Sequence, residues 1–513
     1  MCFLYIITVL FILIVLGYHY YIHYGRNGRL INLIPGPSGY PIFGNLLQYI
    51  GPREKQWKLL MNLINQYYPI VKLWGFFIPF VLIRHPDDLR TFTGKITILS
   101  STQHIKKNFF YDILRPWMGN GILINEGAKW HSIRRTLTPT FHFNILQQHA
   151  EILIKEGENM TMSLKNTGGT VVKDLVPFVS EHTLNAICET LMGTSLRDLD
   201  EFQQKYRKAV HRICELFIYR LLRQWLHNDW IFSLTSKGKE QAKILRILHG
   251  FTNHIIAERK LYHERTNGRL LRRSITSTDT NDTEANGKRI QLSLLDHLIA
   301  DNREGRLTDL DVKEQIDGFM FAGHDTTALN LTYLLMLLAE HKDIQDRVRN
   351  EVNTAFQENG KKFNIKLLQN LTYLNRCIKE TLRLYPSVFL ISRVAGKNVK
   401  LQSYLVPAGT TVVLNIYGVH RDPNFWPNPE TFDPDRFLPE RTQNRHFYSY
   451  IPFSAGPRNC LGQQYALLQI KALIAPLIQN YYLEPITYLK NLRLQADLVL
   501  RPACPLRVKF VPV

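Results

Sequence analysis

An unbroken apolar run occupies residues 1–25. Between Met1 and Gly25 there is no Lys, Arg, Asp or Glu, and residues 3–16 are apolar apart from Thr8. A helix over residues 2–24 would extend roughly 34 Å at about 1.5 Å per residue, enough to cross a hydrocarbon core of about 30 Å. The pattern therefore predicts a transmembrane anchor over residues 1–25.

The flanks of this run favour an uncleaved anchor over a signal peptide. No Lys or Arg precedes it, no A-x-A-like site follows it, and four tyrosines near its C-terminal end are typical of a membrane interface. The first charged side chains, Arg26 and Arg29, come after the run, so the positive-inside rule leaves the bulk of the protein in the cytosol. No later run approaches about 18 consecutive apolar residues, and we expect a single span.

The pattern after the anchor predicts a hinge and then one large domain. Residues 26–45 contain basic side chains and a Pro/Gly-rich segment, which disfavours helix and predicts a stiff elbow. Residues 71–74 and 80–83, separated by Gly75 and Pro79, predict a β-hairpin.

Helical periodicity dominates from about residue 125 to 390. Within this region Ser274–Gly287, rich in Thr, Asp and Asn, predicts an exposed loop. Length alone suggests about three domains, but the pattern favours a single domain over residues 46–513. Its predicted class is mainly α with a small β region (α+β).

Composition and charge restrict the partners. A chain that is 45% hydrophobic and 21% charged can bury a large core. Six cysteines in 513 residues form no dense disulfide framework, which favours a reducing compartment. The net charge of +20 requires acidic partners. The basic stretch Arg259–Arg273 contains only one aromatic residue, Tyr262, and belongs to no nucleic-acid-binding module, so we expect no nucleic acid.

The sharpest chemical signal is the segment Phe453–Gly462, which fits the pattern F-x-x-G-x-R-x-C-x-G. A helical stretch follows Cys460, and its N-terminal N–H groups would stabilise a thiolate. Phe453 can shield sulfur from water, and Arg458 can meet an acidic group of a cofactor. Gly462 permits the close approach of a flat cofactor. Cys460 is therefore the candidate metal ligand.

With this motif the chain resembles the cytochrome P-450 superfamily of heme-thiolate monooxygenases. The resemblance implies heme b with Cys460 as its axial thiolate. Glu380 and Arg383 match the E-x-x-R element one helical turn apart, and Arg436 matches its third partner. By resemblance these three residues are structural and hold the loop that carries Cys460.

One tryptophan and three arginines at further matches resemble the heme propionate ligands of the superfamily. Two buried carboxylates need paired cations. The candidate cofactor-binding residues are, with Phe453, Cys460 and Gly462, Trp130, Arg134, Arg393 and Arg458.

A long helix that begins at Thr308, with Asp311 completing a capping box, and runs to about His341 should carry the oxygen chemistry. Gly323 leaves room for a heme face and dioxygen, and the Thr326 hydroxyl can bond the Ala322 carbonyl and bend the helix. Asp325 and Thr326 form the acid–alcohol pair that, in the superfamily, relays protons during oxygen activation. They are the candidate catalytic residues.

Several segments resemble family 4 of this superfamily, the branch of fatty-acid ω-hydroxylases and their insect relatives. They are Trp117–Leu123, Gly127–Trp130, Arg134–Phe143 and Phe319–Phe321. Many members of that branch have Glu where this chain has Ala322, and that Glu forms an ester with a heme methyl group. Because alanine cannot form an ester, we predict noncovalent heme.

Apolar residues that would lie over the heme favour a lipophilic substrate: a fatty acid, hydrocarbon, terpenoid or xenobiotic. The candidate substrate contacts are Phe109, Ile122, Phe319, Ala322, Val388 and Phe389. The sequence contains no G-x-G-x-x-G and no P-loop, so electrons must come from a separate protein. The resemblance implies NADPH-cytochrome P-450 reductase, with cytochrome b5 as a second candidate, at the endoplasmic reticulum (microsomal) membrane.

Two alternatives to a monooxygenase remain open at this point. One is a peroxide-rearranging heme-thiolate enzyme that needs no reductase, and the other is a heme-binding sensor without turnover. The Asp325–Thr326 pair favours the monooxygenase over both, because neither alternative needs a proton relay.

Overall fold

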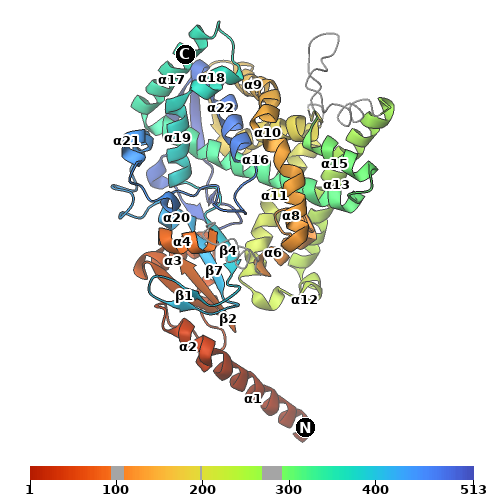
Figure 1. Ribbon diagram of the computed structural model, residues 1–513, viewed down its shortest axis with the longest axis vertical. Coiled ribbons are helices and arrows are strands. Elements are labelled where there is room, and N and C mark those ends of the chain that lie inside the picture. Colours follow the sequence, from red (N-terminus) through yellow and green to blue (C-terminus); the bar gives the residue numbers. More distant parts are fainter. Residues whose placement is uncertain (94–108, 197–198, 268–291) are drawn as a thin grey trace.

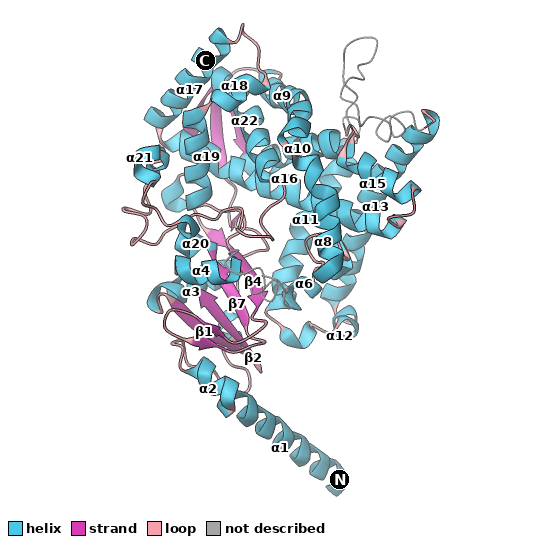
Figure 2. Ribbon diagram, in the orientation of Figure 1, coloured by secondary structure: helices cyan, strands magenta, loops and turns pink. Residues whose placement is uncertain are grey.

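A four-stranded sheet forms the smaller part of the molecule, and helices form the larger part (Figures 1 and 2). The computed structural model describes residues 1–93, 109–196, 199–267 and 292–513. The predicted exposed loop, Ser274–Gly287, and the end of the basic stretch, from residue 268 on, lie outside the described residues. The predicted class, mainly α with a small β region, is confirmed.

The sheet has the order β1-β2-β7-β4, and its strands are β1 (Ile70–Gly75), β2 (Ile78–Ile83), β7 (Thr411–Asn415) and β4 (Leu390–Val394). β1 and β2 pair antiparallel, so the predicted hairpin is confirmed. β7 pairs parallel with β2 and antiparallel with β4, and all five of its residues are buried. The sheet thereby joins residues near 80 to the segment around residue 390.

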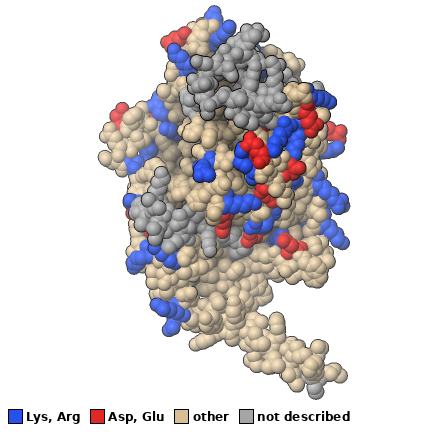
Figure 3. Space-filling view, turned by 45° about the vertical axis from the view of Figure 1, so that its right-hand side comes forward, with Lys and Arg blue, Asp and Glu red and all other residues tan. Residues whose placement is uncertain are grey.

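Helix α1 (Cys2–Tyr24) projects away from the folded body (Figure 1). It is the one helix of the described residues that is long and apolar enough to cross a membrane, and the protein buries none of it. No blue or red side chain lies along this segment in Figure 3. Helix α2 (Arg26–Asn32) follows, and Ile31 and Ile34 are buried against the sheet region. The segment between anchor and domain is therefore partly packed onto the protein.

Helix α16 (Asp309–Glu340) runs through the centre of the helical part (Figure 2). Thr308 accepts from the Asp311 amide while the Asp311 side chain accepts from the Thr308 amide, so the predicted capping box is present. Most of the helix is buried, because α10 (Leu175–Ile187), α13 (Ser236–Arg265) and α22 (Gln463–Asn480) pack around it.

The remaining elements complete the two parts. The other helices are α3 (Arg53–Gln66), α4 (Pro86–Thr93), α6 (Phe109–Asp112), α7 (Arg115–Met118), α8 (Gly127–Leu137), α9 (Phe143–Lys165), α11 (Asp200–Leu221), α12 (Asp229–Ser233), α15 (Leu294–Arg303), α17 (Lys342–Glu358), α18 (Ile365–Asn370), α19 (Thr372–Leu384), α20 (Ile416–Val419) and α21 (Pro439–Thr442). The other strands are β3 (Val171–Asp174), β5 (Val399–Lys400), β6 (Leu405–Val406), β8 (Tyr481–Pro485), β9 (Leu494–Gln495), β10 (Arg501–Pro502) and β11 (Arg507–Pro512).

Candidate functional site

The candidate metal ligand lies in the loop that precedes α22. The loop folds back on itself, because the Cys460 amide donates to the Phe453 carbonyl at 2.9 Å. Gly456 adopts φ +73°, and a Cβ there would lie 1.6 Å from the Thr93 carbonyl oxygen, so the turn requires glycine. Cys460 lines a cavity of about 300 Å³, which we call the cysteine cavity.

The surroundings of Cys460 suit a metal ligand better than a free nucleophile. Cys460 lines the cysteine cavity and has exposed surface, and many protein atoms surround it. Burial raises the pKa of the Cys460 thiol, although the Gly462 N–H and the Arg134 guanidinium oppose this rise. A nucleophilic cysteine needs the opposite shift. Coordination to a metal cation deprotonates a thiol outright, so iron would supply the missing positive charge.

The cysteine cavity brings together most of the predicted site residues. Those that line it are Ile122, Trp130, Arg134, Phe319, Ala322, Thr326, Val388, Phe453, Arg458, Cys460 and Gly462. Arg393 and Asp325 are buried outside its lining, and Phe389 lines a different cavity. The side chain of Phe109 lies outside the described part of the structure.

Three arginines approach this cavity, and none pairs with a carboxylate of the described residues. Arg134 donates to the Asn459 carbonyl at 2.9 Å and to its Oδ1 at 2.8 Å, which ties helix α8 to the cysteine loop. Arg393 is buried and donates to the Ser392 carbonyl at 2.8 Å.

Arg458 is the least satisfied of the three cations. It lies 4.0 Å from the centre of the Trp130 ring and donates through Nη2 to the Asn125 carbonyl at 2.7 Å. Its Nε and Nη1 are buried and have no hydrogen-bond partner in the structure. Burial and the nearby Arg393 lower the pKa of Arg458 to about 10. Largely enclosed arginines that have no carboxylate partner among the described residues suit an anionic ligand, and the two propionates of heme fit this arrangement.

Thr326 of helix α16 lines the cysteine cavity. The Thr326 hydroxyl donates to the Ala322 carbonyl at 2.6 Å, as expected from the sequence. Gly323 lines the cavity, and a Cβ there would lie 1.7 Å from Ile187 Cδ1 of α10. Its missing side chain therefore permits close packing of α10 on α16 as well as opening the cavity.

Asp325 belongs to a buried ion-pair network that the sequence did not indicate. Arg501 Nη2 lies 2.6 Å from Asp325 Oδ2, and Arg501 Nε lies 3.5 Å from Asp497 Oδ2. Arg53 Nη1 pairs with the same Asp497 oxygen at 2.9 Å. Asp325, the candidate relay residue, is thus held by the Arg501 guanidinium. In the sequence, the only local sign of this network was the four-residue spacing of Asp497 and Arg501. Such a spacing is common on protein surfaces.

Glu380, Arg383 and Arg436 meet in one buried cluster on α19 and the segment after α20. Arg383 donates from Nε and Nη2 to the two Glu380 oxygens at 2.7 and 2.8 Å, and Arg436 Nε lies 3.3 Å from Glu380 Oε1. Arg383 also donates to the His420 carbonyl at 2.9 Å and the Pro429 carbonyl at 2.6 Å. The cluster therefore ties α19 to the chain that leads into the cysteine loop.

His420 supports the start of that loop, and its protonation should destabilise the protein. The Ile451 amide donates to His420 Nε2 at 2.9 Å, so this nitrogen must be unprotonated. Burial, Arg383 and Arg421 lower the pKa of His420 to about 3. With an unfolded value near 6.5, its stabilising effect is complete above about pH 6.5 and is lost as the pH falls toward 3. Between pH 6.5 and 5 we expect the contribution of His420 to the free energy of unfolding to fall by about 2 kcal/mol.

The variant His420→Gln keeps an acceptor near the Nε2 position and removes the titration. The free energy of unfolding in urea, measured from pH 7 to 5, should fall by about 2 kcal/mol less in this variant than in the parent. His131→Gln, at an exposed position on α8, is the matched control and should follow the parent. Parallel pH profiles for the parent and His420→Gln would contradict the assignment.

Comparison with known proteins identifies the family. The chain matches the family model described as Cytochrome P450 over residues 34–510. It is 36% identical to cytochrome P450 4c3 of Drosophila melanogaster, over 95% of this chain and 91% of that protein. Identity is 36% with cytochrome P450 4c21 of Blattella germanica, over 95% of each chain. It is 33% with human cytochrome P450 4V2, over 95% of this chain and 91% of that protein. With Cys460 lining a cavity beside arginines that have no carboxylate partner among the described residues, this chain belongs to the cytochrome P450 family of heme-thiolate monooxygenases, and its relatives are of family 4.

Proposed function

We propose that this protein is a membrane-bound monooxygenase that inserts one oxygen atom from O2 into a lipophilic substrate, using electrons from a separate NADPH-dependent reductase. Its family supplies the monooxygenase activity. The observation that carries the proposal is that one mainly apolar cavity brings Cys460 together with Thr326. Heme bound through the Cys460 thiolate would supply the activation of dioxygen in that cavity.

The cofactor in this proposal is heme b, held noncovalently with Cys460 as its axial ligand. The unpartnered Nε and Nη1 of Arg458, together with Arg134 and Arg393, supply cations for its propionates. Trp130 supports Arg458 from the side. Phe453 and Gly462 line the cavity on either side of Cys460 in the chain, where they would shield sulfur and leave room for the ring.

Ala322 supports noncovalent attachment. Its methyl group lines the cysteine cavity at the position where many family 4 members carry an ester-forming Glu. The structural residues Glu380, Arg383 and Arg436 keep the loop of Cys460 in place without touching the cavity.

Thr326 and Asp325 act in different ways in the proposed reaction. Thr326 lines the cavity, and its Oγ1 can hold a proton there. Asp325 is buried outside the lining and paired with Arg501, and in the proposed reaction it relays protons toward Thr326 as the second member of the pair. Ser387 Oγ donates to the Thr326 carbonyl at 2.7 Å and fixes the backbone at this point.

The substrate is proposed to be a fatty acid, hydrocarbon, terpenoid or xenobiotic. Ile122, Phe319, Ala322 and Val388 line the cysteine cavity and would contact it there. Phe389 would contact only a substrate that also extends into the neighbouring cavity. Phe109 remains a sequence-based candidate.

The proposed location is the endoplasmic reticulum membrane, with residues 1–25 as a single-pass anchor, residues 26–45 as the hinge and the catalytic domain 46–513 in the cytosol. The exposed apolar helix α1 supports membrane attachment, and Arg26 and Arg29 support the cytosolic orientation. Proposed electron donors are NADPH-cytochrome P-450 reductase and cytochrome b5. The positive net charge favours acidic docking surfaces on both.

The holoenzyme, combined with reductase, NADPH and a panel of alkanes, fatty acids and terpenoids under 18O2, tests the proposal. We expect a hydroxylated product that carries one 18O atom per turnover and requires NADPH. Product formed from an organic hydroperoxide without NADPH would favour the rearranging enzyme, and no turnover with any class would favour the sensor. Acid acetone should extract all heme from the same preparation, and heme that stays on the polypeptide would contradict noncovalent binding.

A further inference from the structure

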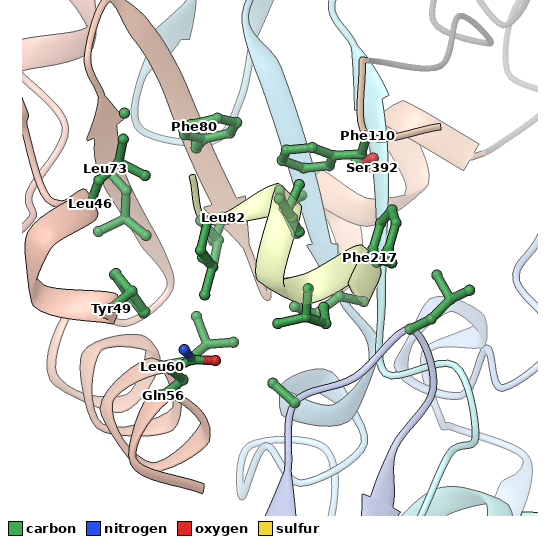
Figure 4. Close-up of a pocket in the computed structure, with 18 of the residues that line it drawn as sticks. Leu46, Tyr49, Gln56, Leu60, Leu73, Phe80, Leu82, Phe110, Phe217 and Ser392 are labelled. Atoms are coloured by element: carbon green, nitrogen blue, oxygen red, sulfur yellow. The ribbon is translucent and has the colours of Figure 1, made fainter. Parts of the chain in front are cut away.

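A second cavity of about 250 Å³ lies between the four-stranded sheet, α3 and α11. We call it the sheet cavity (Figure 4). Apolar side chains make most of its wall, among them Leu60, Phe80, Phe217 and Phe389. Ile391 of β4 lines both this cavity and the cysteine cavity. The two cavities therefore meet at the Ile391 side chain, and a long molecule that passes Ile391 would occupy both.

Two side chains in the wall of the sheet cavity each carry one polar atom that has no hydrogen-bond partner among the described residues. Tyr49 is 8% exposed, and its hydroxyl has no hydrogen-bond partner in the structure. Gln56 is 7% exposed; its Nε2 donates to the Gly51 carbonyl at 2.9 Å, and its Oε1 has no partner. Figure 4 shows both residues on one side of the cavity, opposite Phe110, Phe217 and Ser392. Tyr49 and Gln56 thus lie at the same end of the cavity.

Leaving these groups unpaired is unfavourable. A buried polar group without a hydrogen bond has lost its contacts with water and has gained none in return. Burial alone raises the pKa of Tyr49, so the phenol keeps its proton and is available as a donor. A ligand that accepts from Tyr49 and donates to Gln56 Oε1 would satisfy both groups at once. A hydroxyl group has this combination, whereas a hydrocarbon has neither function.

The charges around the cavity argue against an anionic ligand. Among the described lining residues there is no Lys or Arg, and the one charged side chain is the Asp497 carboxylate. Asp497 is already paired with Arg53 and Arg501. A fatty-acid carboxylate in this cavity would lack a cation and would lie near a like charge, which disfavours its burial.

We infer that Tyr49 and Gln56 bind the hydroxyl group of a long-chain alcohol, whose apolar chain runs past Ile391 into the cysteine cavity. This inference rests on the proposed function and names its substrate class as neutral alcohols. The hydroxyl end is held in the sheet cavity, so oxidation falls on the end of the chain remote from it. Tyr49 and Gln56 are specificity-determining residues in this arrangement.

Equilibrium binding of three matched ligands to the holoenzyme tests the inference without turnover. The ligands are 1-dodecanol, dodecane and dodecanoate, and affinities are compared between parent and variants in one detergent, so that partitioning into the detergent cancels. Tyr49→Phe removes one oxygen atom and should weaken dodecanol binding roughly ten-fold. Gln56→Met should do the same, while dodecane binding stays unchanged in both variants. Tyr448→Phe, which lines neither cavity, is the control.

The outcomes separate the inference from the proposed function. Unchanged dodecanol affinity in Tyr49→Phe and Gln56→Met, or tighter binding of dodecanoate than of dodecanol to the parent, would overturn the inference. Unchanged dodecane binding shows that the variants are folded. If both single variants, Tyr49→Phe and Gln56→Met, lose dodecane binding, the two residues support the folded structure and do not select the ligand. This result would overturn the inference as well. If the parent binds dodecanol selectively but gives no product with reductase and NADPH, the proposed function fails while the inferred site stands.

Discussion

Replacing Cys460 with serine should abolish the thiolate signature of the heme. In the reduced carbon monoxide complex of the parent we expect the red-shifted Soret band of thiolate ligation, and in Cys460→Ser we expect it to be absent. A serine hydroxyl does not ionise in the range in which a metal-bound thiol does, so the variant loses the anionic sulfur ligand. NADPH-dependent product formation should fall below detection, because the electron donation from sulfur that favours O–O cleavage is lost.

The matched control is Cys504→Ser. Cys504 is a partly exposed free cysteine that does not line the cysteine cavity. This variant should keep both the band and the activity. Cys460 is the one cysteine of the described residues that lines this cavity. A thiolate band that survives in Cys460→Ser would show that another residue is the axial ligand.

Local patterns were sufficient to predict the elements that carry the site. The apolar run up to Gly25 predicted α1, the Thr308 and Asp311 pair predicted the start of α16, and the segment Phe453–Gly462 predicted the loop before α22. Each of these signals lies within one element, where neighbours along the chain decide the conformation. The expectation that Cys460 and Thr326 lie at one site came from the family resemblance and not from these local patterns.

Contacts between distant parts of the chain were not predictable from these patterns. Arg501 and Asp325 are 176 positions apart, and nothing local distinguishes a buried pairing arginine from a surface one. Val388 and Phe389 were expected to share one site, yet they line different cavities. They precede β4, and which cavity each one lines is set by how this segment packs against distant parts of the chain. Gly323 likewise fits against Ile187, a contact set by how α10 packs on α16.

Removing Arg501 should cause the largest loss of stability among the variants of the buried network. Arg501→Leu leaves Asp325, 5% exposed, and Asp497, 2% exposed, without the cation between them. Breaking a buried pair by removing one partner costs about 3–5 kcal/mol, because it leaves an uncompensated buried charge. We expect a decrease of this size in the free energy of unfolding, measured in urea at pH 7.5.

The pH dependence of this loss distinguishes a charge effect from lost packing. Burial already raises the pKa of Asp497 to about 6 in the presence of Arg501, and removing the cation raises it further. A carboxyl whose pKa is raised in the folded state stabilises the fold most at a pH below its unfolded-state pKa. This stabilisation is lost as the pH rises through the folded-state pKa. The deficit of Arg501→Leu should therefore shrink from pH 7.5 to 5.5, and Asp325→Asn in the same chain should restore part of it at pH 7.5. Arg507→Leu, an exposed arginine on β11, should change the free energy by no more than about 0.5 kcal/mol. A deficit for Arg501→Leu that is independent of pH, or equal to that of Arg507→Leu, would rule out the buried network as the cause.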